Sequence, residues 1–147
     1  MKKTLVALSI LSMSAVAAFS ADDPIAARKA LMHANAGAAG LSAGMMKGEI
    51  DYSPAAGKAA ISTFNGVAMA YGDFFPEDSM EGDTKAAPAI WENPDEWQAA
   101  LDKFKSDASA AMQASGREGP ADAEAFQAAV GPVLQNCRSC HEDFQLD

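Results

Sequence analysis

The sequence predicts an all-α fold, an antiparallel up-down-up-down four-helix bundle with a long loop between the second and third helices. Alanine, the residue with the highest helix propensity, recurs along the chain, and β-branched residues are sparse. No segment alternates polar and apolar residues for long enough to form a strand. Glycine and proline separate four segments with one apolar face each, and such faces need neighbouring helices to cover them.

The first two helices begin with the same signal, a capping residue followed by proline. Asp23 and Pro24 predict the start of a helix that ends near Lys47, and Ser53 and Pro54 predict the start of a second helix that ends near residue 71. The apolar residues of each helix recur with the helical period and share a face. They are Ile25, Met32, Ala39, Ala43 and Met46 in the first helix, with Arg28 and Asn35 beside them, and Ala60, Phe64, Val67 and Tyr71 in the second.

The third and fourth helices complete the predicted bundle. Pro94 begins the third helix, which ends near Ser115, and Asn93 with Glu96 is placed to form a capping box at its start. The fourth helix covers residues 122–144. The predicted inner faces are Trp97, Leu101, Phe104, Ala108 and Met112 in the third helix, and Phe126, Val130, Val133, Cys137, Cys140, His141 and Phe144 in the fourth.

The connection over residues 72–92 is long for a helix bundle. It contains two prolines and the large apolar residues Phe74, Phe75, Ile90 and Trp91. Since apolar side chains of this size favour burial, we expect the connection to pack over the bundle.

The chain begins with a pattern typical of an export signal. Two lysines precede an apolar run, and residues 18–20 (Ala-Phe-Ser) have the small-x-small form of a signal peptidase site. We therefore expect residues 1–20 to be a signal peptide that is cleaved before Ala21, and residues 21–147 to form one periplasmic domain. The apolar run is short for a membrane span, so no stable membrane insertion is expected.

The net charge of the chain indicates which classes of partner it favours. Cleavage of the signal peptide removes two lysines and no acidic residue, which changes the formal net charge from -9 to -11. Such a charge disfavours nucleic acid and anionic membrane surfaces. It favours redox partner proteins with basic docking faces.

Residues 137–141 read Cys-Arg-Ser-Cys-His, the C-x-x-C-H pattern of covalent c-type haem attachment. Thiols three residues apart on a helix lie on the same side and can each add to a vinyl group, and the next residue projects an imidazole at the iron. The motif uses both cysteines of the chain and follows an export signal. It predicts one haem c, attached through Cys137 and Cys140, with His141 as an iron ligand.

Three other uses of this pattern are weaker. A thioredoxin-like redox pair would begin a helix within an α/β sheet, and the sequence contains no evident strand. A structural zinc site needs four ligands, whereas the only further cysteine or histidine is the distant His33. A simple disulfide between Cys137 and Cys140 would leave His141 without a role.

The sixth position of the iron is usually filled by Met or His, or is left open for a small gas molecule. In an up-down-up-down bundle the haem would lie near the start of the first helix, and Met32 is at that height on the apolar face. Met45, Met46 and Met112 are better interpreted as core residues. Met69 points away from its helix's apolar face, and His33 lies about 100° around the helix from Met32.

The layout resembles the cytochrome c′ family, exported four-helix domains with C-x-x-C-H close to the C-terminus, here CRSCHEDF. Residues 28–35 (RKALMHAN) and 82–93 (GDTKAAPAIWEN) are similar to its low-spin, methionine-ligated branch, the cytochrome c-556 type. The resemblance implies that Met32 is the sixth ligand. In the high-spin branch the distal residue lies about one turn later, near Asn35, where an apolar residue is usual. The resemblance also allows a homodimer through the first two helices.

The sequence therefore predicts a periplasmic electron carrier with His141 and Met32 as axial ligands, and not an enzyme. The alternative is a high-spin, five-coordinate cytochrome c′ that binds gases such as nitric oxide or carbon monoxide. Arg28, one turn before Met32, is a candidate partner for a haem propionate.

Overall fold

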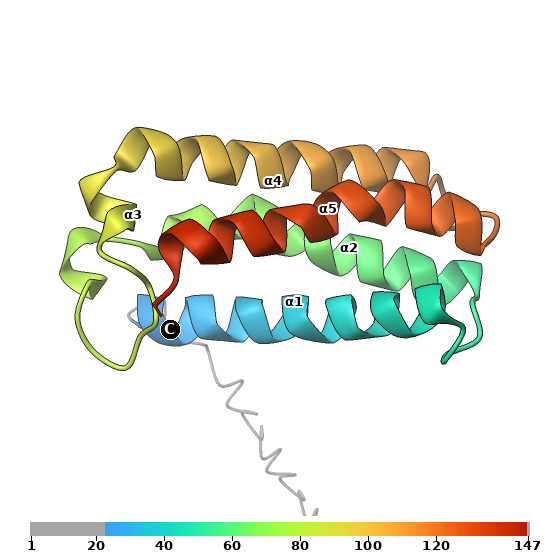
Figure 1. The fold of residues 1–147 in the computed structure, drawn as a ribbon, viewed down its shortest axis with the longest axis horizontal. Helices are drawn as coiled ribbons and strands as arrows, with labels where there is room; N and C mark the ends of the chain where they lie inside the picture. The colour runs from blue at the N-terminus through green and yellow to red at the C-terminus, as the bar shows by residue number, and fades with distance from the viewer. Residues whose placement is uncertain (1–22, 147) are drawn as a thin grey trace, which may run out of the picture.

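Four long helices form an antiparallel bundle in the computed structural model, which describes residues 23–146. They are α1 (Pro24–Lys47), α2 (Pro54–Ala70), α4 (Pro94–Ala114) and α5 (Ala123–Phe144). Figure 1 shows their axes side by side, with the long connection gathered at the end of the bundle where α1 begins and α5 ends. The predicted fold class is confirmed. The predicted signal peptide, residues 1–20, and its cleavage before Ala21 lie outside the described residues.

Side-chain caps begin three of the four long helices. Asp23 accepts a hydrogen bond from the backbone N–H of Ala26 at 2.8 Å, and Ser53 and Asp122 cap α2 and α5 in the same way. The predicted capping box before α4 is wrong, because the side chain of Asn93 makes no cap bond. Its backbone N–H instead bonds the carbonyl of Ala89, so a one-turn helix leads directly into α4.

The main core fills the middle of the bundle and the end away from the long connection. Its largest fully buried side chains come from α2 and α5 and are Phe64, Ile61, Phe126, Val130 and Val133. The predicted inner faces of these two helices are thereby confirmed over this stretch.

The buried face of α1 differs from the predicted one. The predicted apolar stripe, from Ile25 through Met32 to Met46, is only half-buried. The buried positions lie beside it and are Arg28, Asn35, Ala38, Ser42, Gly44 and Met45. Apolar periodicity misses this face because three of its members are polar side chains.

The long connection packs against the bundle, as predicted. It contains two short 3-10 helices, η1 (Tyr71–Phe74) and η2 (Glu77–Ser79), and the helix α3 (Ala89–Glu92). Phe75, Ile90 and Trp91 of the connection join a second core cluster with Trp97 of α4 and Phe144 of α5. The ring centroids of Phe75 and Trp97 are 4.8 Å apart. This cluster closes the end of the bundle that faces the connection.

The end of the chain pairs with the same connection. The N–H of Ala87 donates to the carbonyl of Phe144, and the N–H of Leu146 donates to the carbonyl of Lys85. Ala86 and Gln145 thus form an isolated antiparallel bridge, and residues 23–146 contain no strand. The pairing holds the C-terminal turn of α5 against the connection. Among the helices described, none is long and apolar enough to cross a bilayer.

Candidate functional site

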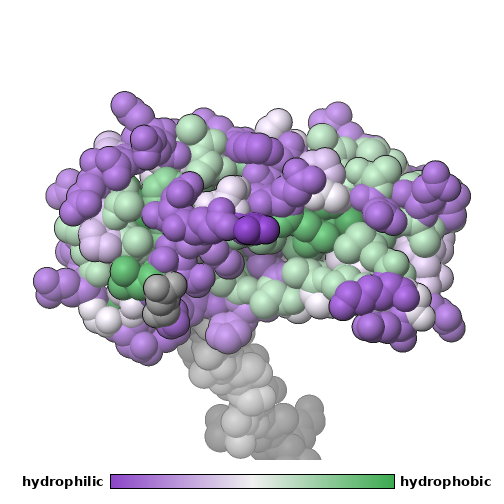
Figure 2. Space-filling view, in the orientation of Figure 1, coloured by the Kyte–Doolittle hydropathy of each residue, from purple (hydrophilic) through white to green (hydrophobic). Residues whose placement is uncertain are grey.

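A cavity of about 590 Å³ lies among α1, α4, α5 and the end of α2. This volume falls within the range of small-molecule and cofactor pockets. Its walls include Met32, Asn35, Ala36 and Ala39 from α1, Tyr71 after α2, Ala100, Leu101 and Phe104 from α4, and Asn136, Cys137, Cys140 and His141 from α5. On the face shown in Figure 2, apolar residues appear along α1 and α5 between polar ones.

The three motif side chains meet at this cavity. Cys137 and Cys140 are half-buried on the last turns of α5 and are not joined by a disulfide, and His141 is exposed but also lines the cavity. Burial raises the pKa of the Cys137 thiol. Burial also raises the pKa of Cys140 to about 11, with smaller contributions from Cys137 and Asp143. Both thiols are therefore protonated at neutral pH, and both face the same space.

Met32 lines the same cavity from α1, across from the motif on α5. The other methionines considered lie elsewhere. Met45 is 3% exposed within the main core, Met46 and Met112 pack against that core, and Met69 is 58% exposed. The core positions predicted for Met45, Met46 and Met112 and the outward position predicted for Met69 are thus confirmed. His33 is exposed, as predicted, but it also borders the cavity.

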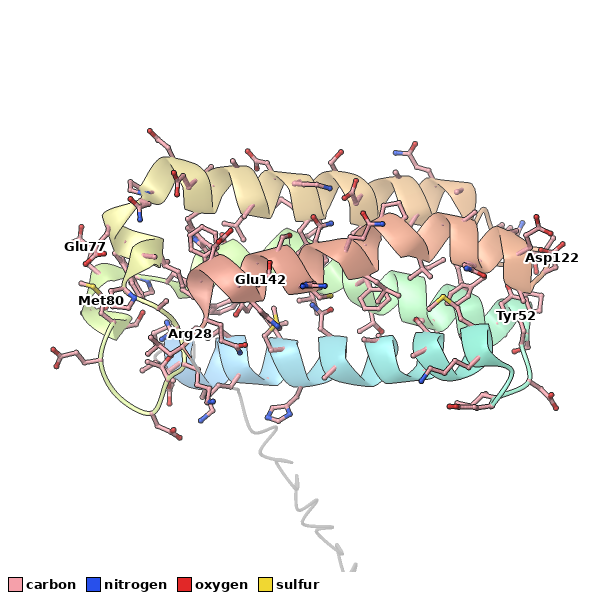
Figure 3. The ribbon with its side chains drawn as sticks, viewed as in Figure 1. Arg28, Tyr52, Glu77, Met80, Asp122 and Glu142 are labelled. Carbon is pink, nitrogen blue, oxygen red and sulfur yellow. The ribbon has the colours of Figure 1, made fainter. Side chains whose placement is uncertain are left out.

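Arg28 is almost completely buried, at 3% exposure, and its guanidinium holds the long connection. Its terminal nitrogens donate four hydrogen bonds, to the Phe74 carbonyl (3.2 Å), the Ser79 hydroxyl (2.9 Å), the Ser79 carbonyl (2.8 Å) and the Thr84 hydroxyl (2.7 Å). The guanidinium carbon also lies 4.9 Å from the centre of the Phe75 ring. In Figure 3, Arg28 lies near the start of α1, beside this connection.

The charge of Arg28 has no carboxylate partner within 4 Å in the part of the chain that the structure describes. Burial lowers the pKa of Arg28, partly offset by Tyr71 and Asp23. A smaller cavity of about 130 Å³ adjoins Arg28, and it shares Met32, Cys140 and His141 with the larger one. A buried cation therefore lies next to the candidate site without an ion-pair contact in the described part of the chain.

Two wall residues, Tyr71 and Asn136, were not predicted as site residues from the sequence. Tyr71 was placed only on the inner face of its helix, and burial raises the pKa of its hydroxyl to about 12. Asn35, a third wall residue, was placed beside the apolar face of α1 and, through the family resemblance, near the distal position of the high-spin branch. Asn136 immediately precedes the motif, and that position was the only available signal for it.

Asn136 joins α5 to α4 at the wall of the cavity. Its amide N–H₂ donates to a carboxylate oxygen of Asp107 at 2.8 Å and to the carbonyl of Pro132 at 3.1 Å. Lys103 donates to the same Asp107 oxygen at 2.7 Å. The hydrogen bonds from Lys103 and, second, from Asn136 lower the pKa of Asp107. The wall beside Cys137 is thereby braced by a polar network.

The residues present fit a covalently attached haem. Two thiols and an imidazole line one wall, a thioether lines the opposite wall, and Leu101 and Phe104 provide apolar surface between them. Thioether and imidazole are the usual axial ligands of c-type haem iron. The unpaired cation of Arg28 matches the negative charge of a haem propionate.

Comparisons with known proteins agree with this arrangement. A family model described as Cytochrome C' matches residues 23–145. The chain is 33% identical to a cytochrome c-556 of Agrobacterium fabrum over 98% of this chain and 95% of that protein. It is 36% identical to a cytochrome c′ of Rhodopseudomonas palustris, over 84% of this chain and 82% of that protein.

A solved cytochrome c′ structure from Rhodopseudomonas palustris has a TM-score of 0.75 with this chain at 32% identity. The match covers 85% of this chain and 97% of that one. Sequence, fold and cavity therefore point the same way. The chain belongs to the cytochrome c′ family, and the predicted cofactor, a haem c with its iron, is the cofactor of that family.

Proposed function

We propose that the chain is a periplasmic electron carrier, with one haem c attached through Cys137 and Cys140 and with His141 and Met32 as the axial ligands of the iron. The observation that carries the proposal is that these four side chains line one cavity from two facing helices. The proposal includes no enzymatic reaction. The similarity of the chain to a cytochrome c-556 supports the pair of axial ligands, His141 and Met32.

The chain's own residues would bind the haem and surround it with apolar side chains. Thioether bonds at two cysteines would fix its position along α5, and His141 and Met32 would approach the iron from opposite walls. When bound, haem iron supplies a one-electron couple between its ferrous and ferric states. Because both ligands belong to a rigid bundle, little rearrangement accompanies the change. The apolar surface of Leu101 and Phe104 lowers the local dielectric, which raises the cost of the more charged ferric state.

Arg28 is proposed to pair with a haem propionate. Its four hydrogen bonds all go to neutral acceptors, so they satisfy its donors without compensating its charge. A buried charge is stabilised when an opposite charge lies nearby. The smaller cavity beside Arg28 offers a place for such a group next to the main site.

The second candidate is a five-coordinate, gas-binding cytochrome c′. Its support is the similarity to proteins named cytochrome c′, such as the one from Rhodopseudomonas palustris. In this case Met32 would be an ordinary half-buried methionine. The cavity would then leave space for carbon monoxide or nitric oxide on the Met32 side.

Covalent attachment is tested by mass spectrometry of the mature protein, produced in cells with haem maturation machinery. The expected mass is that of the chain from Ala21 plus one haem. Ser variants of Cys137 and Cys140 should each lose one thioether bond. A mature chain with two free thiols or a disulfide under these conditions would reject the proposal.

The ligand pair is tested by absorption spectra and carbon monoxide binding. The wild-type ferrous protein should be low-spin and bind the gas slowly, because the gas must displace a bonded sulfur. Met32→Ala should be high-spin, bind the gas faster and have a lower reduction potential. Met69→Ala is the matched control and should behave as wild type, since Met69 is exposed on the far side of α2. A high-spin wild type that binds the gas readily would favour the second candidate.

A homodimer through α1 and α2 stays a prediction from the family resemblance. Sedimentation of the holoprotein over a range of concentrations checks it directly, because a dimer of this kind sediments as twice the monomer mass.

A further inference from the structure

Asn35 is a buried polar residue without a partner. It is 8% exposed, its amide oxygen is inaccessible, and this oxygen accepts no hydrogen bond. No hydrogen bond found among residues 23–146 involves its side chain. Buried side-chain polar groups are nearly always satisfied in folded proteins, so an exception needs an explanation.

The other buried polar side chains show that the exception is specific. Ser42 donates to the Ala38 carbonyl at 2.7 Å, Ser115 to the Met112 carbonyl at 2.9 Å, and Arg28 and Ser79 bond each other. Asn136, the other buried amide on the cavity wall, uses its N–H₂ group twice within the protein. Asn35 is thus the one buried amide of the described chain whose side chain makes no hydrogen bond within the protein.

The position of Asn35 indicates which group could be its hydrogen-bond partner. It lies on α1 three residues after Met32, and side chains at this spacing are neighbours on a helix surface. Both residues line the large cavity, opposite the haem-attachment motif. The described chain supplies no hydrogen-bond partner to this amide, and the group that fills the cavity can supply one.

We propose that the Asn35 amide donates a hydrogen bond to whatever occupies the sixth position of the haem iron. In the resting protein the acceptor is the thioether sulfur of Met32. A diatomic gas becomes the acceptor where Met32 is displaced or replaced. The amide oxygen is the inaccessible end, so the N–H₂ end, which has no acceptor among the described residues, is the one left to face the cavity. This inference rests on the proposed function, because it assumes haem in the cavity and a sixth position on the Met32 side.

The hydrogen bond to the Met32 sulfur is tested by the reduction potential of the holoprotein, and this test is called the sulfur arm. A donated hydrogen bond withdraws electron density from the thioether and directs positive charge toward the iron, which disfavours the ferric state. Asn35→Leu removes the donor at similar volume and should lower the potential. Asn35→Gln keeps an amide and should restore part of the shift. A potential that does not fall in Asn35→Leu would overturn the sulfur arm.

The gas arm uses the ferrous carbon monoxide complex in the Met32→Ala background. A positive dipole near the gas oxygen increases back-donation from iron and lowers the C–O stretching frequency. Adding Asn35→Leu should raise this frequency and speed gas dissociation by about three- to tenfold, as expected for one hydrogen bond. An unchanged frequency would overturn the gas arm.

Thermal unfolding of the holoprotein separates a ligand role from a structural one. Asn136→Leu is the matched control, because it breaks two bonds within the protein and should lower the unfolding midpoint. Asn35→Leu breaks none and should not lower it in the Met32→Ala background without gas. If Asn35→Leu destabilises the protein as Asn136→Leu does while potential and frequency stay unchanged, Asn35 is structural and the proposal is wrong.

Failure of the proposed function can be distinguished from failure of the Asn35 proposal. A wild-type spectrum without sulfur ligation would reject Met32 as the ligand. The gas arm would then be measured in the wild-type background, where it still decides the role of Asn35. A low-spin wild type with an unaltered potential and C–O frequency in the Asn35 variants would reject the present proposal alone.

Discussion

At the scale of single residues, Arg28 attaches the long connection between α2 and α4 to α1. It lies one turn before Met32 on α1, and its fork reaches acceptors 46 to 56 residues further along the chain. Planar guanidinium groups suit such fixed sets of acceptors better than the flexible ammonium of lysine. The connection that closes the haem end of the bundle is therefore attached to the helix that carries the proposed sixth ligand.

Replacement of Arg28 should loosen this attachment. Arg28→Met removes four hydrogen bonds and leaves the Ser79 hydroxyl and carbonyl with fewer partners, so the free energy of unfolding should fall by about 2 to 4 kcal/mol. Arg28→Lys should recover only part of the loss, because lysine lacks the fork. Thr84→Val, which removes one of the four bonds, should cost about 1 kcal/mol. Urea denaturation of the holoproteins measures these values, and equal stability of Arg28→Met and wild type would contradict the role.

At the scale of elements, α4 and α5 are joined by polar as well as apolar contacts. The apolar contacts of α5 lie around Phe126 and Val133 and, at its C-terminal end, between Phe144 and Trp97 of α4. Between these two apolar contacts, the hydrogen bond from Asn136 to Asp107 adds a polar attachment to α4 immediately before the first motif cysteine. This bond therefore helps to hold the C-terminal half of α5 at the height of the proposed haem attachment.

The network should make stability depend on pH in the acid range. Asp107 has a folded-state pKa below its usual value of 3.8 because Lys103 and Asn136 bond its ionised form. Its contribution is present above about pH 4 and is lost as the pH falls through the folded pKa. Asp107→Asn should therefore lower the free energy of unfolding by about 1 kcal/mol at pH 7 and by progressively less below pH 4.

Chemical denaturation at several pH values checks this expectation. Asp102→Asn is the control on the same helix, since Asp102 is exposed and its side chain accepts a bond only from Gln98 among the described residues. A stability difference for Asp107→Asn that stays constant from pH 7 to pH 3 would show that ionisation of Asp107 does not contribute.

At the scale of the whole molecule, the charge is uneven. The mature chain is expected to carry a net charge of -11, yet the opening of the haem cavity includes Lys29 and Lys85. Lys29 pairs with the exposed Asp83 at 2.6 Å, which lowers the pKa of that carboxyl. A partner would thus experience a negative long-range field and a more mixed surface at short range.

Electron transfer with the proposed basic redox partner should slow as salt increases. Long-range attraction between opposite net charges speeds encounter, and mobile ions screen it over about 10 Å at 0.1 M ionic strength. The bimolecular rate constant, measured by stopped flow, should fall between low and moderate ionic strength. Lys85→Glu makes the cavity opening more acidic and should steepen this dependence. A flat or rising rate would show that net charge does not steer docking.

The sequence by itself determined the helix boundaries and the attachment motif. Caps such as Asp23 and Ser53 act within one turn, and the thiols of Cys137 and Cys140 share a helix side at any position in a fold. Local geometry is enough for both, so both could be read from neighbouring residues. Placing Met32 near the motif also needed only helix direction and rise, and the cavity agrees with that placement.

Only the tertiary structure decided which face of α1 is buried and what its polar residues contact. The partners of Arg28 come from a distant loop, and Asn35 stands out only once every other buried polar group is seen to be bonded. Apolar periodicity assigns polar residues to the outside, whereas burial depends on whether a distant segment supplies a hydrogen bond. The physical reason is that such partners are brought together by packing between helices, which no local pattern encodes.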